Sequence, residues 1–202
     1  MDFGAGSHFR HVRRSIAQEC KNSSIVPKYG RLLHQILSYF QPSVGIELGS
    51  CLGVSTFYQY LAFLSFPEAR FYSIEGDAAL SAYLQAKIKH WPTASSMEFQ
   101  GIVGNFQEVL PPLLQKLDHV DYAFIDGHHQ LEPTLHYFSL FKEKSRAQTI
   151  LIFDDIHWSE GMEKAWNTIK KDPDIRLSLD FYRFGVVFFN PALSKEDHVI
   201  RY

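Results

Sequence analysis

The sequence has few cysteines, almost no excess charge and no long hydrophobic run. Its 202 residues include two cysteines, Cys20 and Cys51, which are too few for a disulfide framework and are typical of a reducing compartment. A net charge of −2 gives no overall attraction to nucleic acid or to an anionic membrane. No stretch reaches the roughly 18–20 apolar residues that a membrane span needs, and residues 1–7 lack the basic-then-apolar order of a signal peptide. We therefore expect a cytoplasmic protein without nucleic-acid or membrane partners.

The composition that remains favours a folded globular domain. Hydrophobic residues make up 46% of the chain and aromatic residues 15%, which together with the small net charge argues against intrinsic disorder. No repeat, low-complexity tract or flexible linker interrupts the sequence, so we predict a single domain over residues 1–202. Residues 1–40 begin polar and partly basic and end in an amphipathic run at 29–40, which predicts an N-terminal helical cap.

Short apolar runs alternate with segments of helical periodicity through the rest of the chain. Continuous apolar runs are typical of parallel strands buried on both faces, and their alternation with helices predicts a doubly wound α/β domain. The last two runs meet at a tight turn near Arg183 and predict an antiparallel hairpin at the sheet edge, where two copies would pair in a homodimer. The seven predicted strands are residues 44–48, 70–75, 98–103, 120–126, 149–154, 175–182 and 184–189, and the predicted helices that follow the first five are 54–64, 78–91, 106–117, 132–144 and 159–171.

The first strand leads into a turn with two glycines. Ligands of open α/β sheets bind beyond the carboxyl ends of the strands, and Gly49 and Gly53 let the backbone approach such a ligand closely. A dinucleotide site would read Gly-x-Gly-x-x-Gly, but position 51 is cysteine. Glu47 instead suits the ammonium group of an amino-acid-like ligand. The alternative is a tight strand-to-helix turn without a ligand.

Polar residues also follow the second and third strands. Glu75, which precedes Gly76, suits the two hydroxyl groups of a ribose. Asn105, Phe106 and Gln107 follow the third strand and offer two amides and an aromatic ring for a purine. The alternatives are an ordinary solvated glutamate and a phenylalanine that packs against its own helix.

Acidic residues follow the fourth and fifth strands. Asp126, Asp154 and Asp155 are expected to lie near one another, with three histidines in the same loops, namely His128, His129 and His157. Carboxylates suit Mg²⁺, and a neutral imidazole suits softer metals or proton abstraction. The alternative is one aspartate that caps a helix and another that is solvated. The glycine-rich segment at residues 2–7 also looks like a cofactor loop, but no strand precedes it and we reject it as the binding loop.

In these motifs the chain resembles the class I S-adenosylmethionine-dependent methyltransferases. It is most similar to small O-methyltransferases related to catechol O-methyltransferase and to uncharacterised bacterial relatives. The likeness covers roughly residues 28–189 and is strongest at 46–55, 74–76, 124–128 and 153–157. The resemblance implies a Rossmann-like sheet. The residues that it implies for S-adenosylmethionine are Glu47, Gly49, Ser50, Gly53, Ser55, Glu75, Gly76, Asn105, Phe106, Gln107 and Asp126.

The resemblance also implies a metal site. Catechol-type enzymes bind Mg²⁺ through an aspartate after the fourth strand and an Asp-Asn pair after the fifth, which correspond here to Asp126, Asp154 and Asp155, for Mg²⁺ or another divalent metal. Two positions depart from that pattern: Asp155 replaces the asparagine, and His129 replaces a catalytic lysine. Some relatives begin further upstream, so part of an N-terminal cap is expected to be missing from this chain.

The expected function is methyl transfer from S-adenosylmethionine to an oxygen or nitrogen atom of a small-molecule acceptor. The catalytic residues would be His129 or His157 as base, together with Asp126, while Trp158 and the aromatic N-terminal segment would wall the acceptor pocket. Two alternatives are a metal-dependent hydroxylase- or hydrolase-like enzyme on the same scaffold, and a catalytically silent protein that binds S-adenosylmethionine.

Overall fold

The computed structural model of this chain describes residues 24–93 and 97–202. The segment at 2–7, Cys20 and the aromatic N-terminal segment lie outside the described residues, as does most of the predicted cap. Within the described part of the chain, no helix is both long and apolar enough to cross a membrane.

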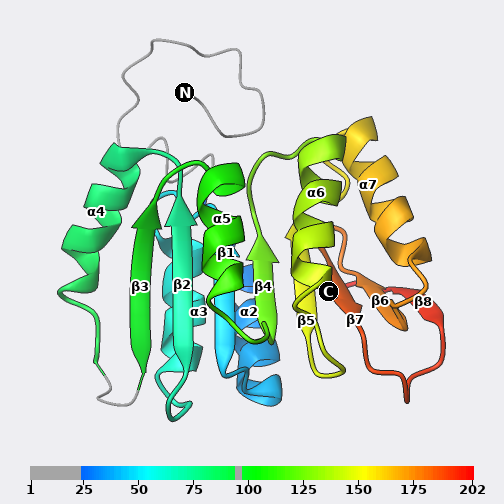
Figure 1. Cartoon of the computed structure of the whole chain (residues 1–202), viewed down its shortest axis with the longest axis horizontal. Coiled ribbons are helices and arrows are strands. Elements are labelled where there is room, and N and C mark those ends of the chain that lie inside the picture. Colours follow the sequence, from blue (N-terminus) through cyan, green and yellow to red (C-terminus); the bar gives the residue numbers. More distant parts are fainter. Residues whose placement is uncertain (1–23, 94–96) are drawn as a thin grey trace. The chain divides into compact units, whose positions relative to one another are not determined.

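The chain divides into two compact units, Met1–Phe106 and Gln107–Tyr202. Figure 1 labels their helices and strands, and each unit is described by itself. The prediction of a single domain over residues 1–202 stays a prediction.

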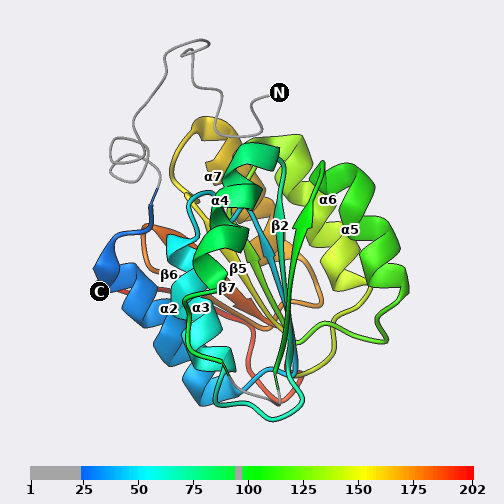
Figure 2. The ribbon, with the colours of Figure 1, turned by 90° about the vertical axis from the view of Figure 1, so that its left-hand side faces the viewer.

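The first unit is a layer of parallel strands covered by helices. Its elements are α2 (Pro27–Phe40), β1 (Val44–Leu48), α3 (Val54–Phe63), β2 (Arg70–Glu75), α4 (Ala78–Ile88) and β3 (Glu98–Val103). The strands are parallel in the order β3-β2-β1, with Val44 beside Arg70 and Arg70 beside Glu98. Helices α3 and α4 lie on one face of this layer, and α2 packs against α3 (Figure 2). The carboxyl ends of β1 and β2 therefore open at the same edge.

The sequence explains how this layer packs. Phe63 of α3 stacks on Phe71 of β2, with ring centroids 4.8 Å apart and planes 4° apart. A Cβ at Gly45 of β1 would overlap the Phe63 ring, so glycine is needed there. Asp77 caps α4 because its Oδ1 accepts hydrogen bonds from the backbone N–H groups of Ala79 (2.7 Å) and Leu80 (3.1 Å). Strand β3 was expected to be buried but is partly exposed, because it ends the order β3-β2-β1.

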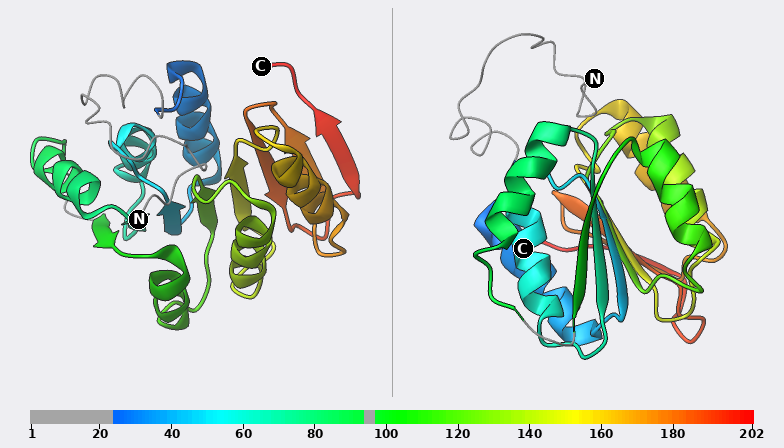
Figure 3. Two further views of the ribbon diagram at one scale, coloured as in Figure 1. Left: turned by 90° about the horizontal axis from the view of Figure 1, so that it is seen from above. Right: turned by 60° about the vertical axis from the view of Figure 1, so that its left-hand side comes forward.

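The second unit holds a mixed set of strands. Its elements are α5 (Phe106–Gln115), β4 (Tyr122–Ile125), α6 (Leu131–Lys142), β5 (Ile150–Asp154), α7 (Glu160–Lys171), β6 (Leu177–Asp180), β7 (Phe184–Phe188) and β8 (Glu196–Val199). The strand order is β4-β5-β7-β6-β8, with β7 antiparallel to both β5 and β6. Helices α6 and α7 pack side by side (Figure 3). Because β7 is antiparallel to β5, the turn between β6 and β7 lies at the carboxyl end of β5.

The predicted α/β fold with a C-terminal antiparallel hairpin is confirmed, with two corrections. The described residues form eight strands rather than seven, because β8 was not predicted. The β6–β7 hairpin is not at the edge, since β8 pairs in parallel with β6. Strand β8 reads Glu-Asp-His-Val and is exposed throughout, so it carries no apolar pattern that a sequence analysis would detect.

Candidate functional site

The turn after β1 has an unusual backbone. Gly49 and Gly53 have φ angles of 93° and 81°, and Cys51 between them has a φ of 46°. All three values lie in the left-handed region, which glycine adopts without strain. The N–H of Gly53 donates to the carbonyl of Ser50 at 2.7 Å, and Gly53 is the N-cap of α3. The turn therefore places a glycine-capped helix N-terminus beyond β1, an arrangement that suits polar or anionic groups.

Glu47 faces the protein interior rather than a ligand. Its side chain is fully buried, and each carboxylate oxygen accepts two hydrogen bonds. Oε1 accepts from Ser55 (2.7 Å) and Gln59 (2.6 Å), and Oε2 accepts from Thr56 (2.7 Å) and Ser73 (2.7 Å). A carboxylate has about four lone-pair positions, so these donors fill them. Glu47 therefore joins β1 to α3 and β2, which does not support its predicted contact with the ligand's ammonium group.

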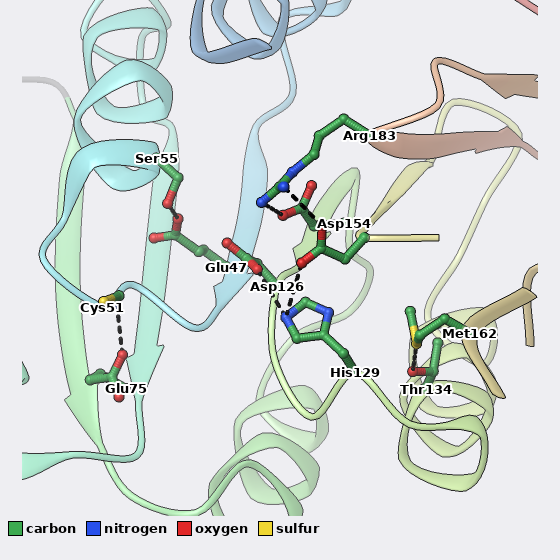
Figure 4. A network of polar contacts seen from close by, with 11 residues as sticks. Glu47, Cys51, Ser55, Glu75, Asp126, His129, Thr134, Asp154, Met162 and Arg183 are labelled. Atoms are coloured by element: carbon green, nitrogen blue, oxygen red, sulfur yellow. Dashed lines mark hydrogen bonds and ion pairs between the residues drawn. The ribbon is translucent and has the colours of Figure 1, made fainter. Parts of the chain in front are cut away.

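The same network fixes the serines of this turn. Ser55 donates its hydroxyl proton to Glu47 (Figure 4), so that proton is not available to S-adenosylmethionine, for which the resemblance implies Ser55. Ser50 is 2% exposed, and its Oγ lies 3.5 Å from Oε2 of Glu75, a long contact. These two serines therefore support the turn from within.

Glu75 at the end of β2 is held by backbone donors. The N–H of Cys51 donates to Oε2 at 2.7 Å (Figure 4), and the N–H of Asp77 donates to Oε1 at 2.9 Å. Burial raises the pKa of Glu75, and the Asp77 charge adds to this, while the N–H groups of Asp77, Cys51 and Gly76 oppose it. A carboxylate has about four lone-pair positions, and the N–H of Gly76 and the hydroxyl of Ser50 are also directed toward it, so a ribose hydroxyl would have to replace the long Ser50 contact. The predicted ribose contact of Glu75 stays a prediction.

The residues after β3 differ in their exposure. Asn105 is half-buried and Gln107 is exposed, so both amides are accessible to some degree. Phe106 is 2% exposed. The structure therefore agrees with the packing alternative for this ring, and the predicted purine contact of these three residues stays a prediction.

In the second unit, Asp126, Asp154 and Asp155 form the acidic cluster. Arg183, in the turn between β6 and β7, lies beside two of these carboxylates: its Nη1 is 3.1 Å from Oδ1 of Asp155, and its Nη2 is 3.4 Å from Oδ2 of Asp154. The carbonyl of Arg183 also accepts the N–H of Asp155 at 2.8 Å. Both the side chain and the backbone of Arg183 thus join the hairpin turn to the end of β5.

His129 is the second basic residue in the cluster. Its Nε2 lies 3.4 Å from Oδ1 of Asp126 (Figure 4). The same nitrogen lies 4.0 Å from Oδ2 of Asp155. Burial alone would lower the pKa of His129, but the hydrogen bond to Asp126 and the charges of the cluster outweigh it and raise the pKa. The raised pKa favours the protonated form of His129, which cannot act as a base, so the prediction of His129 as the base gains no support from this geometry.

The carboxylates respond to burial and to one another. Asp154 is 1% exposed, and burial raises its pKa well above the ordinary value, with the charges of Asp126 and Asp155 adding to the effect. Burial also raises the pKa of Asp155, while His129 and Arg183 oppose the rise. Three acidic residues therefore face two basic residues, Arg183 and His129. The cluster has no net charge when both basic residues and one acidic residue are protonated.

This arrangement does not suit the divalent metal that the resemblance implies. Metal sites in proteins place several oxygens at about 2.0–2.6 Å from the ion. Here a guanidinium group lies against two of the three carboxylates and an imidazole lies against the third. In the described ranges, no three His, Cys, Asp or Glu residues form a group that could hold a metal ion. The metal expectation therefore gains no support from the geometry.

The environment of His157 differs from that of His129. His157 pairs with Asp180 (Nε2 to Oδ2, 2.9 Å) and with Glu163 (Nδ1 to Oε1, 3.4 Å), so both ring nitrogens face carboxylates outside the acidic cluster. Its ring stacks on that of Tyr182, with centroids 5.4 Å apart. Trp158 is 60% exposed. The predicted roles of His157 as base and of Trp158 as pocket wall stay predictions.

His128 has a different environment. Its Nδ1 lies 2.6 Å from the hydroxyl of Tyr137, whose pKa burial raises to about 12. Burial, followed by the charge of His129, lowers the pKa of His128. The lowered pKa favours the uncharged form of His128, and the Tyr137 hydroxyl lies within hydrogen-bond distance of its Nδ1.

Sequence reasoning missed Arg183 as a member of the acidic cluster. The sequence did place Arg183 at the tight turn of the predicted hairpin. The sequence did not show which strand pairs with β7. Strand β7 pairs antiparallel with β5, with Asp154 opposite Phe184, and the turn therefore lies beside the aspartates.

Known proteins provide independent evidence. Residues 46–156 match the family described as Methyltransferase domain. No curated protein matches the chain. Solved structures with a similar fold include an O-methyltransferase from Bacillus cereus in complex with SAH (17% identity, TM-score 0.68, 83% of each chain). Another is the O-methyltransferase TomG from Streptomyces achromogenes, involved in tomaymycin synthesis and solved with SAM (18%, TM-score 0.69, 83% of this chain and 82% of that one). A third is the SAH-bound methyltransferase PaMTH1 from Podospora anserina (14%, TM-score 0.69, 83% and 80%).

At these identities the structural likeness shows the fold, which is the predicted Rossmann-like one. The family match rests on the sequence itself, and it includes the turn after β1, Glu75 and all three aspartates of the acidic cluster. Because the match spans more than half of the 202 residues, the protein belongs to the methyltransferase-domain family.

Proposed function

We propose that the protein transfers the methyl group of S-adenosylmethionine to an oxygen atom, or to a nitrogen atom, of a small-molecule acceptor. Membership of the methyltransferase-domain family supports methyl transfer over a hydroxylase- or hydrolase-like reaction. Two neighbours of similar fold are O-methyltransferases, and the solved complexes contain SAM or SAH. The observation that carries the proposal is the carboxylate of Glu75, fixed by two backbone N–H groups at the end of β2.

The first unit would bind the methyl donor. Glu75 would accept the two ribose hydroxyls, and the left-handed turn from Gly49 to Gly53 would hold the methionine part. Asn105, near the end of this unit, would border the adenine. Glu47 would act as a positioning residue, because its four hydrogen bonds hold α3 against β1 and β2 behind the turn.

The second unit would handle the acceptor. When bound, S-adenosylmethionine supplies a methyl group that is electrophilic because it is attached to a sulfonium. The protein has to align the acceptor for in-line attack and to receive its proton. Asp126 would take that proton as the acceptor atom bonds to the methyl carbon and the methyl–sulfur bond breaks, which leaves the demethylated product, and His129, 3.4 Å away, would hold the carboxylate in place. The cytoplasm is the proposed setting, as two cysteines and a net charge of −2 support.

Calorimetric titration with S-adenosylmethionine and with its demethylated product tests the donor site. Hydrogen bonds to a charged group are worth about 1.5–3 kcal/mol, so Glu75→Ala should weaken binding about tenfold or more. Glu98→Gln is the matched control, because it removes an exposed carboxylate from the opposite end of a strand in the same unit. Absence of binding to well-folded wild-type protein would refute the proposal.

Asp126→Asn tests the acceptor side. This variant should bind the donor as the wild type does and lose methyl transfer to those members of an acceptor panel that the wild type methylates. Donor binding by the wild type without transfer to any phenol, catechol or amine in the panel would instead identify a catalytically silent binding protein.

A further inference from the structure

We infer that Arg183, rather than a divalent metal ion, is the resident cation of the acidic cluster of Asp126, Asp154 and Asp155. The guanidinium group lies 3.1 Å from Asp155 and 3.4 Å from Asp154, two of the three residues that the resemblance assigns to a metal. The protein thus supplies from its own β6–β7 turn the positive charge that a bound ion would provide.

The position of Arg183 is set by the fold. Its carbonyl accepts the N–H of Asp155 at 2.8 Å, and its own N–H donates to the carbonyl of Phe181 at 2.8 Å. The turn is further fixed because the N–H of Tyr182 donates to Oδ1 of Asp180 at 2.8 Å. The guanidinium is therefore held beside the end of β5 by the backbone of the hairpin as well as by its charge.

A divalent ion would have to displace this group. Mg²⁺ requires several oxygens at about 2.0–2.1 Å in octahedral geometry, so it would have to lie among the carboxylate oxygens that now face Arg183. An arginine stays charged at all accessible pH values and does not vacate the site by losing a proton. A divalent ion beside the guanidinium group would be repelled by its positive charge. Water screens this repulsion little, because Asp154 is only 1% exposed.

His129 completes the charge balance. Each of the three carboxylates has a nitrogen of Arg183 or His129 within 4.0 Å. In the part of the chain that the structure describes, Oδ1 of Asp154 is a buried oxygen without a hydrogen-bond partner. One such oxygen is a single ligand, which is fewer than a divalent ion needs.

The inference makes a prediction that does not depend on methyl transfer. Removal of the guanidinium would leave three converging carboxylates with one fewer cation, and this would create a metal site where the wild type has none. Arg183→Met keeps most of the side-chain length without the charge. Arg146→Met is the matched control, because Arg146 also binds a buried aspartate, Asp121, through Nη2 at 2.6 Å.

Thermal melting in millimolar MgCl2, MnCl2 and CaCl2, without donor or acceptor, gives the readout. The melting temperature of the wild type and of Arg146→Met should not depend on the metal, and that of Arg183→Met should rise by several degrees with at least one of the three ions. Calorimetric titration of Arg183→Met with the same ion should show one site. If the double variant Arg183→Met, Asp154→Asn no longer binds that ion, the metal site is assigned to the acidic cluster.

Two outcomes would overturn the inference. One is saturable binding of one metal ion by the wild type that Asp154→Asn abolishes. The other is a folded Arg183→Met that binds no metal. If Arg183→Met does not fold, Arg183→Lys replaces it, because lysine keeps the positive charge without the planar guanidinium group. Arg183→Lys should be folded and should still bind no metal. The titration of the wild type with metal ions also tests the inference by itself. None of these readouts uses methyl transfer, so failure here is distinguishable from failure of the proposed function.

Discussion

The backbone N–H of Cys51 donates a 2.7 Å hydrogen bond to Oε2 of Glu75, which joins the turn after β1 to the end of β2. Cys51 has a φ of 46°, so the turn adopts a left-handed conformation at the residue that makes this bond. The other oxygen of Glu75 is held by the N–H of Asp77. The carboxylate is thus oriented mainly by backbone groups, with the Ser50 hydroxyl 3.5 Å from Oε2, and its ionisation should control donor binding.

Donor affinity should depend on pH through Glu75. Its pKa is raised mainly by burial, so protonation begins at a higher pH than for an ordinary glutamate. The carboxylate accepts hydroxyl protons better than the neutral acid, so affinity for the demethylated product should fall as the pH is lowered through the raised pKa. Calorimetry from about pH 8 down to the ordinary glutamate pKa of about 4.3 should show this fall in the wild type and a flat, weaker affinity in Glu75→Gln. The same fall in Glu75→Gln would contradict this assignment.

Glu47 should matter for stability. Glu47→Ala leaves four buried donors without their acceptor, and it should lower the free energy of unfolding by about 3–5 kcal/mol. Glu47→Gln should cost less, about 1–2 kcal/mol, because the hydroxyls of Thr56 and Ser73 can turn to accept from its amide. Urea unfolding measures both values.

The control for this series is again Glu98→Gln, which should change the free energy of unfolding by less than about 0.5 kcal/mol. If Glu47→Ala proved as stable as the wild type, the buried network would not hold α3 to the strands. If Glu47→Gln were the more destabilising variant, reorientation of the two hydroxyls would be refuted.

Gly53 should resist substitution by alanine. Its φ of 81° is left-handed, and an added Cβ would lie 2.5 Å from Cδ1 of Leu84. Gly53→Ala should therefore lower the free energy of unfolding by about 1–3 kcal/mol. Gly161→Ala is the matched control: it lies in α7, its Cβ would meet nothing closer than 3.6 Å, and it should raise the free energy by about 0.5–1 kcal/mol. Equal effects of the two substitutions would show that the left-handed turn is not required.

The fold was predictable wherever burial leaves a pattern in the sequence. The bounds of β1 and β2 agree with the predicted runs at 44–48 and 70–75, because these runs are buried and end where the chain reaches the surface. The bounds of β3 agree with the run at 98–103, although that strand is partly exposed. Strand β8 was not predictable, since its four exposed residues pair through the backbone alone. The positions of the acidic residues were predictable, because these residues follow the predicted ends of the strands.

The direction of each side chain was not predictable. Glu47 looked like a ligand-binding residue because it precedes a glycine turn, yet its four partners come from α3 and β2, and only the packed structure brings them together. Arg183 was visible as a turn residue, but its contact with Asp154 spans 29 positions and depends on the antiparallel pairing of β7 with β5. Spacing in the sequence locates strand ends, whereas partner choice depends on long-range topology.

His128 and His129, adjacent in sequence, should titrate on opposite sides of the ordinary histidine value of about 6.5. The pKa of His128 is lowered by burial and by the charge of His129. The pKa of His129 is raised because Asp126 and the rest of the acidic cluster outweigh its burial. Histidine ring resonances followed by NMR through a pH series should show His129 still protonated where His128 is already neutral.

The sign of each effect on stability follows from these shifts. His129 stabilises the fold fully below the unfolded pKa of about 6.5, and that stability is lost as the pH rises through its raised folded pKa. His128 does the reverse: its contribution is present above about 6.5 and is lost as the pH falls through its lowered folded pKa. Asp126→Asn removes the carboxylate that lies 3.4 Å from His129, so it should lower the pKa of His129 and leave that of His128 below 6.5. An unchanged His129 titration in Asp126→Asn would show that Asp155 and Asp154 alone suffice to raise the pKa of this histidine. The contact between His129 and Asp126, which the proposed proton transfer uses, would then be refuted.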